Sequence, residues 1–158
     1  MSQATIRTAA LAVLDSVTDI GITHNRARWA SLWNDLRDQY QTTISTVTQL
    51  RGWWVEWEGF APFAEDFESY SGVVRGHRVR IHGLLGLDDS ASTELTAAVL
   101  TEAVANAFDG AASFHNSVTG NYVATTAAEV EVFEARTIGG ALVHYSEITF
   151  TVYEAVNN

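Results

Sequence analysis

Apolar residues in the first forty positions recur at intervals of three and four, the spacing of one face of an α-helix. This spacing predicts a first helix over residues 4–17 and a second helix over residues 26–41. The apolar stripe of the second helix comprises Trp29, Leu32, Trp33, Leu36 and Tyr40. Each helix therefore offers one apolar face for burial.

Alternation of apolar and polar residues predicts two strands in the middle of the chain, over residues 50–58 and 73–85. One side of the first strand carries Trp53, Val55 and Trp57, and the other side carries Trp54, Glu56 and Glu58. In the second strand, the side opposite Val79 and Ile81 carries Arg78, Arg80 and His82. The segment 59–72 contains Pro62 and is predicted to be an irregular loop.

The second half of the chain predicts one more helix and two more strands. Residue types that cap helices mark both ends of this helix, with Asp88, Asp89 and Ser90 at its start and Gly110 just beyond Phe108. Residues 111–127 form a polar loop in this interpretation. Strands follow over residues 129–137 and 142–155, joined by a turn at Gly139-Gly140.

This order of elements predicts one domain over residues 1–158, of the α+β class. We expect a mainly antiparallel sheet of four or more strands, with the helices packed on one face. Such an open sheet leaves strand edges exposed, and exposed edges pair with other strands unless they are protected.

Composition argues for a folded chain, because 47% of the residues are hydrophobic and 18% are charged. No apolar run is long enough to span a bilayer, and the first residues lack the features of a signal peptide. We therefore expect a soluble protein that is made inside a cell. The chain has no cysteine, and its nine basic residues are all arginine, which excludes thiolate chemistry, cysteine zinc sites and the P-loop lysine.

The formal net charge of −10 opposes binding to a nucleic-acid backbone, where affinity comes from cations that displace counterions. Arg75, Arg78 and Arg80 are the one group of basic residues close together in sequence. A surface that repels DNA still suits a protein past which DNA must slide.

Candidate catalytic and metal-binding residues do not form a convincing set. His77 and His82 are five positions apart on a predicted strand, so they point to opposite faces, and the other histidines have no metal-ligand spacing. Asp88 and Asp89 are predicted to be helix caps rather than an acid/base pair. No nucleophile elbow or nucleotide-binding motif is present. We therefore predict no catalytic residue, cofactor or metal.

The aromatic residues around position 54 allow two interpretations. They could stack on a base or sugar, but the neighbouring charges are glutamates, which repel phosphate. The favoured interpretation places them in the core and at a subunit interface, where tryptophan and tyrosine are common. The candidates for core and subunit contacts are Trp53, Trp54, Trp57, Tyr145 and Tyr153. Arg75, Arg78 and Arg80 either pair with acidic groups of a neighbouring subunit or form a solvated strand face.

Several segments, in order along nearly the whole chain, resemble one family of small phage proteins. They are Gly21-Ile22-Thr23-His24 with Arg28-Trp29-Ala30 and Trp33, Gly52-Trp53-Trp54-Val55, residues 77–83 with 87–92, and residues 139–152. This family is similar to the tail terminators of long-tailed bacteriophages. The sequence departs from the pattern after His24, where a proline is missing, and in segments 59–72 and 111–127.

The resemblance implies a virion structural protein rather than an enzyme. Such subunits form a hexameric ring that caps the tail tube, stops its polymerisation and joins it to a head-completion or connector protein. DNA passes the lumen without specific binding, and no membrane is involved. Two alternatives stay open: another neck component, such as a stopper or connector, and a small α+β enzyme or ligand-binding domain. The second alternative predicts a cavity lined by His82, Asp88 and His144.

Overall fold

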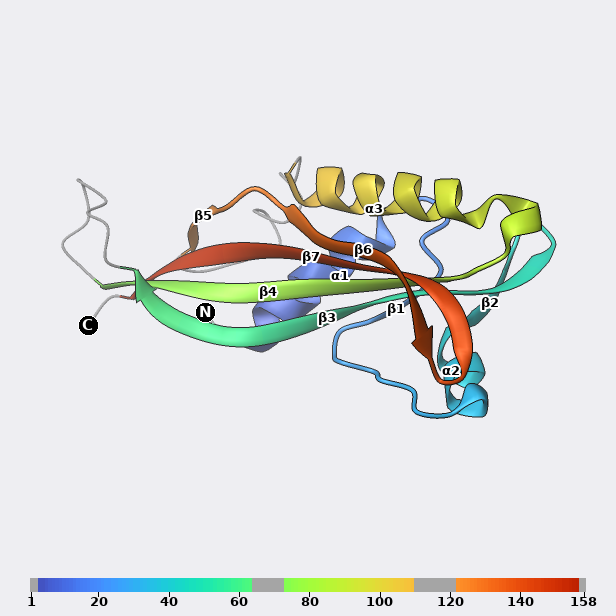
Figure 1. Cartoon of the computed structure of the whole chain (residues 1–158). Coiled ribbons are helices and arrows are strands. Elements are labelled where there is room, and N and C mark those ends of the chain that lie inside the picture. The colour runs from blue at the N-terminus through green and yellow to red at the C-terminus, as the bar shows by residue number, and fades with distance from the viewer. Residues whose placement is uncertain (1–2, 64–72, 110–121, 157–158) are drawn as a thin grey trace.

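The computed structural model describes residues 3–63, 73–109 and 122–156. Its centre is a sheet of seven strands in which three long strands carry most of the pairing (Figure 1). The strands are β1 (Ile22–His24), β2 (Gln41–Ile44), β3 (Val47–Phe63), β4 (Val73–Gly86), β5 (Tyr122–Thr125), β6 (Glu129–Ile138) and β7 (Ala141–Val156). All strand pairs are antiparallel except β1 with β3, so the predicted α+β class with a mainly antiparallel sheet is confirmed.

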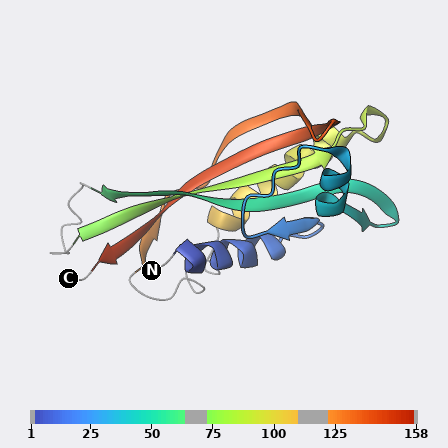
Figure 2. The ribbon, with the colours of Figure 1, turned by 90° about the horizontal axis from the view of Figure 1, so that it is seen from below.

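The long strands lie in the order β3-β4-β7, with β4 in the middle. β4 pairs with β7 along its whole length, from Val73 opposite Val156 to Gly86 opposite Val143. Figure 2 shows these strands as a twisted ribbon, the right-handed twist expected of L-residues in strands. On the outer sides, β1 and β2 cover one half of β3, while β5 and β6 each pair with part of β7.

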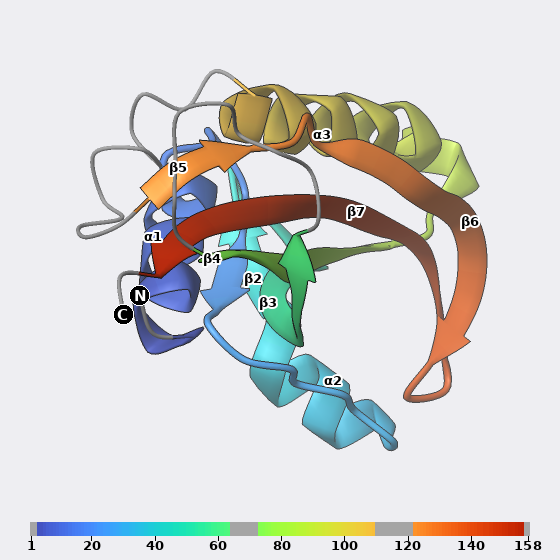
Figure 3. The same ribbon diagram turned by 90° about the vertical axis from the view of Figure 1, so that its left-hand side faces the viewer.

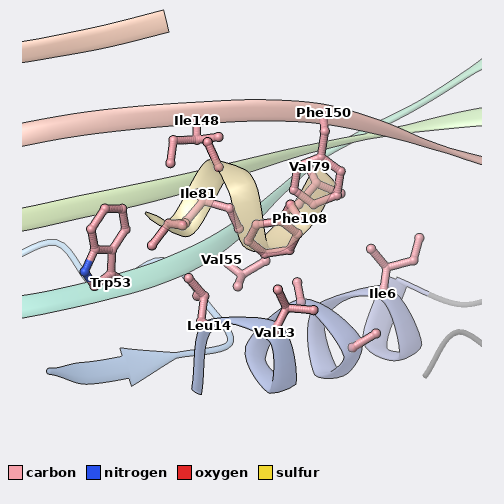
Figure 4. Close-up of a cluster of buried hydrophobic side chains, with 14 of the residues drawn as sticks. Ile6, Val13, Leu14, Trp53, Val55, Val79, Ile81, Phe108, Ile148 and Phe150 are labelled. Atoms are coloured by element: carbon pink, nitrogen blue, oxygen red, sulfur yellow. The ribbon is translucent and has the colours of Figure 1, made fainter. Parts of the chain in front are cut away.

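Two helices, α1 (Gln3–Asp15) and α3 (Thr93–Asp109), pack on one face of the sheet and form the larger core with it. Figure 4 shows this core, where Val13 and Leu14 of α1 face Val55 and Ile81 of the strands. The ring of Phe108 stacks on that of Phe150, with centroids 4.7 Å apart. The helical spacing of the apolar residues in α1 therefore marked its buried face correctly.

The third helix, α2 (Trp33–Tyr40), packs on the opposite face. Its Leu36 and Tyr40 contact a second core that includes Trp54 and Tyr145. Figure 3 shows α2 and α3 on either side of the long strands. The expected packing of helices on one face thus holds for α1 and α3 but not for α2. The cause is the pair Trp53-Trp54: consecutive strand residues point to opposite faces, so each face has one large apolar side chain to cover.

The predicted helix over residues 26–41 is wrong for its first half. Residues 26–32 are not helical, although Ala30 is buried. The Trp29 ring instead meets Trp54 edge-on, with centroids 4.9 Å apart, and the Tyr40 hydroxyl donates a hydrogen bond to the Arg28 carbonyl. These tertiary contacts determine the conformation of the segment and override the helical spacing of its apolar residues.

Other predictions are corrected in part. β3 runs on to Phe63, where a loop was expected from residue 59, and residues 64–72 lie outside the described part. The short strands β1, β2 and β5 were not predicted. Within the expected loop 111–127, residues 122–125 form β5, while Gly110 and residues 111–121 are not described.

The predicted helix cap at Asp88 and the predicted glycine turn at Gly139-Gly140 are both confirmed. The Asp88 carboxylate accepts a hydrogen bond of 3.0 Å from the Ser90 amide and so caps the short helix η1 (Asp89–Ala91), which leads into α3. At the β6–β7 turn, Gly139 and Gly140 have φ values of 56° and 82°. A two-residue hairpin turn with left-handed residues at both positions favours glycine strongly.

Candidate functional site on the open face of the sheet

Three of the expected interface residues belong to the cores of the subunit itself. The exposed fraction is 3% for Trp53 and 0% for both Trp54 and Tyr145. Trp53 lies in the core with α1 and α3, whereas Trp54 and Tyr145 lie in the core with α2. Their assignment to subunit contacts is therefore corrected: in this fold they offer no surface to a partner.

Trp57 and Tyr153 are half-buried. The Trp57 indole N–H donates a hydrogen bond of 3.3 Å to His77 Nδ1, and His77 Nε2 lies 2.8 Å from a Glu154 carboxylate oxygen. Burial lowers the pKa of His77. These hydrogen bonds link β3, β4 and β7 through Trp57, His77 and Glu154. A contact of Trp57 or Tyr153 with a partner subunit stays a prediction.

Arg78 and Arg80 share one acidic partner, the Glu58 carboxylate, whereas Arg75 contacts an aromatic ring. Arg75 lies over the Phe60 ring, 4.9 Å from its centroid, and the Arg78 side chain is 64% exposed. Arg80 finds its acidic partners within its own chain: its Nε–H donates a hydrogen bond of 2.8 Å to Glu58. The expected pairing with a neighbouring subunit is thus corrected for Arg80, and it stays a prediction for Arg75 and Arg78.

We use the term open face for the face of the sheet opposite α1 and α3. Beyond α2, this face carries a continuous hydrogen-bonded network of five side chains: Glu56, His82, Tyr145, Glu147 and Arg80. His82 Nε2 lies 2.8 Å from Glu56 Oε2, and His82 Nδ1 lies 2.6 Å from the Tyr145 hydroxyl oxygen. The Tyr145 hydroxyl donates a hydrogen bond of 2.7 Å to Glu147, which also pairs with Arg80. The register places these residues side by side, because Trp54, His82 and Glu147 are opposite one another on β3, β4 and β7.

Burial and hydrogen bonding shift the ionisation of this network. Burial lowers the pKa of His82, and the nearby Glu56 carboxylate offsets this only in part. For Glu147, burial raises the pKa, but hydrogen bonds from Tyr145 and Arg80 outweigh it, so the net pKa is lowered. Burial, aided by the Glu147 carboxylate, raises the pKa of Tyr145. At neutral pH the network therefore combines an un-ionised phenol, which donates its one proton to Glu147, with the Glu147 carboxylate.

The His82 ring has little room for a substrate. It stacks on Trp54 with centroids 4.7 Å apart, meets Trp29 at 5.3 Å, and is 3% exposed. The three residues expected to share a cavity do not converge. His82 lies on the open face, His144 contacts Thr93 at 3.0 Å, and Asp88 caps η1.

An apolar patch borders the network. We call it the tryptophan patch, formed by Trp29, Leu32 and Trp33, which are 53%, 65% and 48% exposed. Sequence reasoning missed this patch because the helical spacing placed all three side chains on a buried helix face. Asn25, a favourable cap residue, precedes the segment, so the sequence carries no signal against that helix.

Two strand edges are also uncovered within the described part of the chain. Beyond Trp54, where the pairing with β1 ends, residues 55–63 of β3 have no strand on their outer side. β6 pairs with β7 and with no other described strand. Large apolar side chains are exposed on both edges, with Phe60 on β3 and Val130 and Phe133 on β6. The two edges lie on opposite sides of the sheet and differ in sequence.

Among the residues that the structure describes, no three His, Asp or Glu side chains are placed to hold a common metal ion. No described helix is long and apolar enough to cross a membrane. Comparison of the sequence with known proteins finds no matching family model and no similar curated protein.

Proposed function

We propose that this protein is a ring-forming structural subunit of a phage virion, a tail terminator. In this role it caps the tail tube, stops the tube's polymerisation and joins the tail to the head while DNA passes through the lumen. The succession of sequence segments that resemble tail terminators supports the proposal. The structural observation that carries it is the pair of unlike free edges, the outer side of β3 beyond Trp54 and the outer side of β6.

A cyclic ring with head-to-tail contacts requires two different surfaces on opposite sides of each subunit. A sheet with one free edge on each side meets this requirement. Phe60 is 53% exposed on the β3 edge, and Phe133 is 39% exposed on the β6 edge. Exposed apolar edge strands are usually covered by a partner, because open edges promote uncontrolled association.

Charge supports the same role. The net charge of −10 repels the phosphates of DNA, which suits a lumen that DNA passes without being held. On the open face, Glu56, Glu58 and Glu147 each pair with a residue of this chain. The exposed tryptophan patch is suited to contact a second virion protein, the tail tube or a head-completion protein.

The first experiment measures assembly. Light scattering after size-exclusion chromatography gives the mass of the purified protein, and negative-stain microscopy shows its form. We expect rings, and we expect the edge variants Phe60→Lys and Phe133→Lys to be folded monomers because a lysine disfavours strand pairing at an edge. Leu95→Lys is the matched control, since Leu95 is 69% exposed on α3 and belongs to neither edge strand.

The second experiment tests the terminator role itself. Tail-tube subunits from the same genome are polymerised with and without the protein, and tube lengths are measured by electron microscopy. We expect shorter tubes with ring density at one end, and no shortening with Phe133→Lys. Tubes that grow equally long in both conditions would refute the terminator. A labelled virion map that placed the protein at the portal would identify another neck component.

A further inference from the structure

A hollow of about 480 Å³ lies at the end of the sheet formed by the β2–β3 hairpin. Its walls come from that hairpin, from the start of α3 with η1, and from the turn that follows α1. Figure 1 shows the hairpin and the start of α3 at the same end of the molecule. The volume is within the range of small-molecule binding sites. None of the network residues on the open face lines this hollow.

Arg51 lines the hollow and is buried, with an exposed fraction of 6%. Its Nη1 donates a hydrogen bond of 2.8 Å to the Asp19 carbonyl, and its Nη2 donates one of 3.1 Å to the Gln49 side-chain oxygen. Its Nε–H is buried and has no hydrogen-bond partner within the described part of the chain. Both acceptors are neutral, and no described carboxylate forms an ion pair with Arg51.

Burial lowers the pKa of Arg51, and the Asp19 carboxylate opposes this only in part and from beyond ion-pair distance. A buried guanidinium without a carboxylate at ion-pair distance is costly, because buried charges in proteins are normally paired. Anchoring the turn after α1 explains only one of the five N–H donors of Arg51. Gly21 leaves room for the Arg51 side chain, because a Cβ at Gly21 would lie 2.8 Å from Arg51 Cγ and 2.5 Å from the Arg51 carbonyl oxygen. The cation is therefore held in place beside an empty volume.

We propose that this hollow binds a carboxylate carried on an apolar group, and that Arg51 is the residue that receives the carboxylate. The apolar walls that would contact the rest of the ligand are Ile44, Val47, Leu50, Leu87 and Ala91. Arginine suits this task because its planar fork matches a carboxylate. The site is independent of the proposed ring function.

Two acidic residues also line the hollow and oppose an anion. The Asp88 carboxylate is occupied by the amide and hydroxyl of Ser90, at 3.0 and 2.6 Å. Asp19 is exposed and has a φ of 57°, a conformation that asparagine adopts readily. Asp19→Asn thus removes one competing charge without altering the backbone, and it gives a variant that should bind more tightly.

The test is a titration followed by NMR, with hexanoate as the charged probe and hexanamide as the uncharged one. We expect hexanoate to shift the Arg51 Nε–H signal and to bind about tenfold more tightly than hexanamide, the factor that one charge-assisted hydrogen bond supplies. Asp19→Asn should tighten hexanoate binding about two- to fivefold, as removal of a partly exposed like charge does. Arg51→Met should abolish the preference for the charged probe.

Ala91→Phe fills the hollow without touching Arg51, so it should abolish hexanoate binding even if Arg51→Met fails to fold. Leu95→Phe is its control, because Leu95 is exposed on α3 and does not line the hollow. A leucine-rich hexapeptide with a free carboxyl end, compared with its amide, identifies the source. Tighter binding than hexanoate indicates a protein-borne carboxylate, and equal or weaker binding indicates a free acid. Equal affinity for hexanoate and hexanamide, or unchanged binding in Ala91→Phe, overturns the proposal.

Discussion

The Tyr145 hydroxyl joins the two halves of the open-face network, and its removal in Tyr145→Phe should destabilise the fold strongly. The side chain is fully buried, so the phenylalanine ring keeps the same packing and only the oxygen is lost. That oxygen donates to Glu147 at 2.7 Å and lies 2.6 Å from His82 Nδ1. The substitution therefore removes one polar contact from His82 and one from Glu147 at once.

The expected loss follows from these two contacts. A hydrogen bond to a charged group contributes about 1.5–3 kcal/mol, and a buried polar atom left unpaired costs about 1–3 kcal/mol. Glu147 retains its ion pair with Arg80, so its share falls at the lower end. We expect a total loss of about 2–4 kcal/mol in the free energy of unfolding. For a chain of this length, that lowers Tm by about 5–15 °C.

Tyr40→Phe is the matched comparison. Tyr40 is also fully buried and also loses one hydroxyl, but its partner is the carbonyl of Arg28, a neutral acceptor that is half-buried. Water can reach that carbonyl, so a loss of about 1 kcal/mol is expected. Urea unfolding followed by tryptophan fluorescence measures both variants, at two protein concentrations because assembly stabilises the folded state. If Tyr145→Phe lost no more than Tyr40→Phe, the network would not hold the open face together.

Two further predictions concern packing and pH. Gly83→Ala should lower the free energy of unfolding by about 2–3 kcal/mol, because a Cβ there would lie 2.4 Å from the Trp53 ring. Gly86→Ala is the control: its Cβ would meet its nearest atom at 3.5 Å, so urea unfolding should show almost no change. Burial lowers the pKa values of His77 and His82 below the unfolded value of about 6.5, so the stability they contribute is complete above that pH and is lost as the pH falls towards the folded pKa values. Tm should therefore fall between about pH 7 and pH 5, and a Tm that rises over this interval would contradict the assignment.

The period of the apolar residues predicted the elements that end up in the larger core. Val79 and Ile81 alternate along β4 because one face of that strand meets α1 and α3, and the same burial spaces Val13 and Leu14 along α1. Where one face of a helix or strand is buried, the period of its apolar residues predicts the type of element. The fold class could be predicted from the sequence for this reason.

Residues 26–32 show where such reasoning stops. Trp29 has helical spacing with Trp33, yet it packs on Trp54 and His82 from a segment without regular structure. The partners that decide its conformation are far away in sequence, so no local pattern contains them. The tryptophan patch could not be predicted for the same reason.

The open-face network could not be predicted from the sequence either, although the sequence analysis named most of its residues. Alternation placed Glu56 opposite Val55 and His82 opposite Ile81, each within its own strand. The pairing of Glu56 with His82 depends on the register of β3 with β4, where Trp54 is opposite His82. If one strand shifted its register by one residue, all the side chains of that strand would change to the other face of the sheet. Register is set by the whole sheet and its turns, so the five residues of the network become one site only in the folded chain.

In the proposed ring, this dependence on register would link the network to assembly. Ion pairs and hydrogen bonds that cross β3, β4 and β7 hold the twist of the sheet, and the twist sets the angle between the free edges of β3 and β6. A ring closes only if that angle matches the rotation between neighbouring subunits; otherwise head-to-tail contacts generate an open filament. Polar side chains that contact no partner can thus govern oligomer closure, and Tyr145→Phe should broaden the distribution of assembled masses as well as lower Tm.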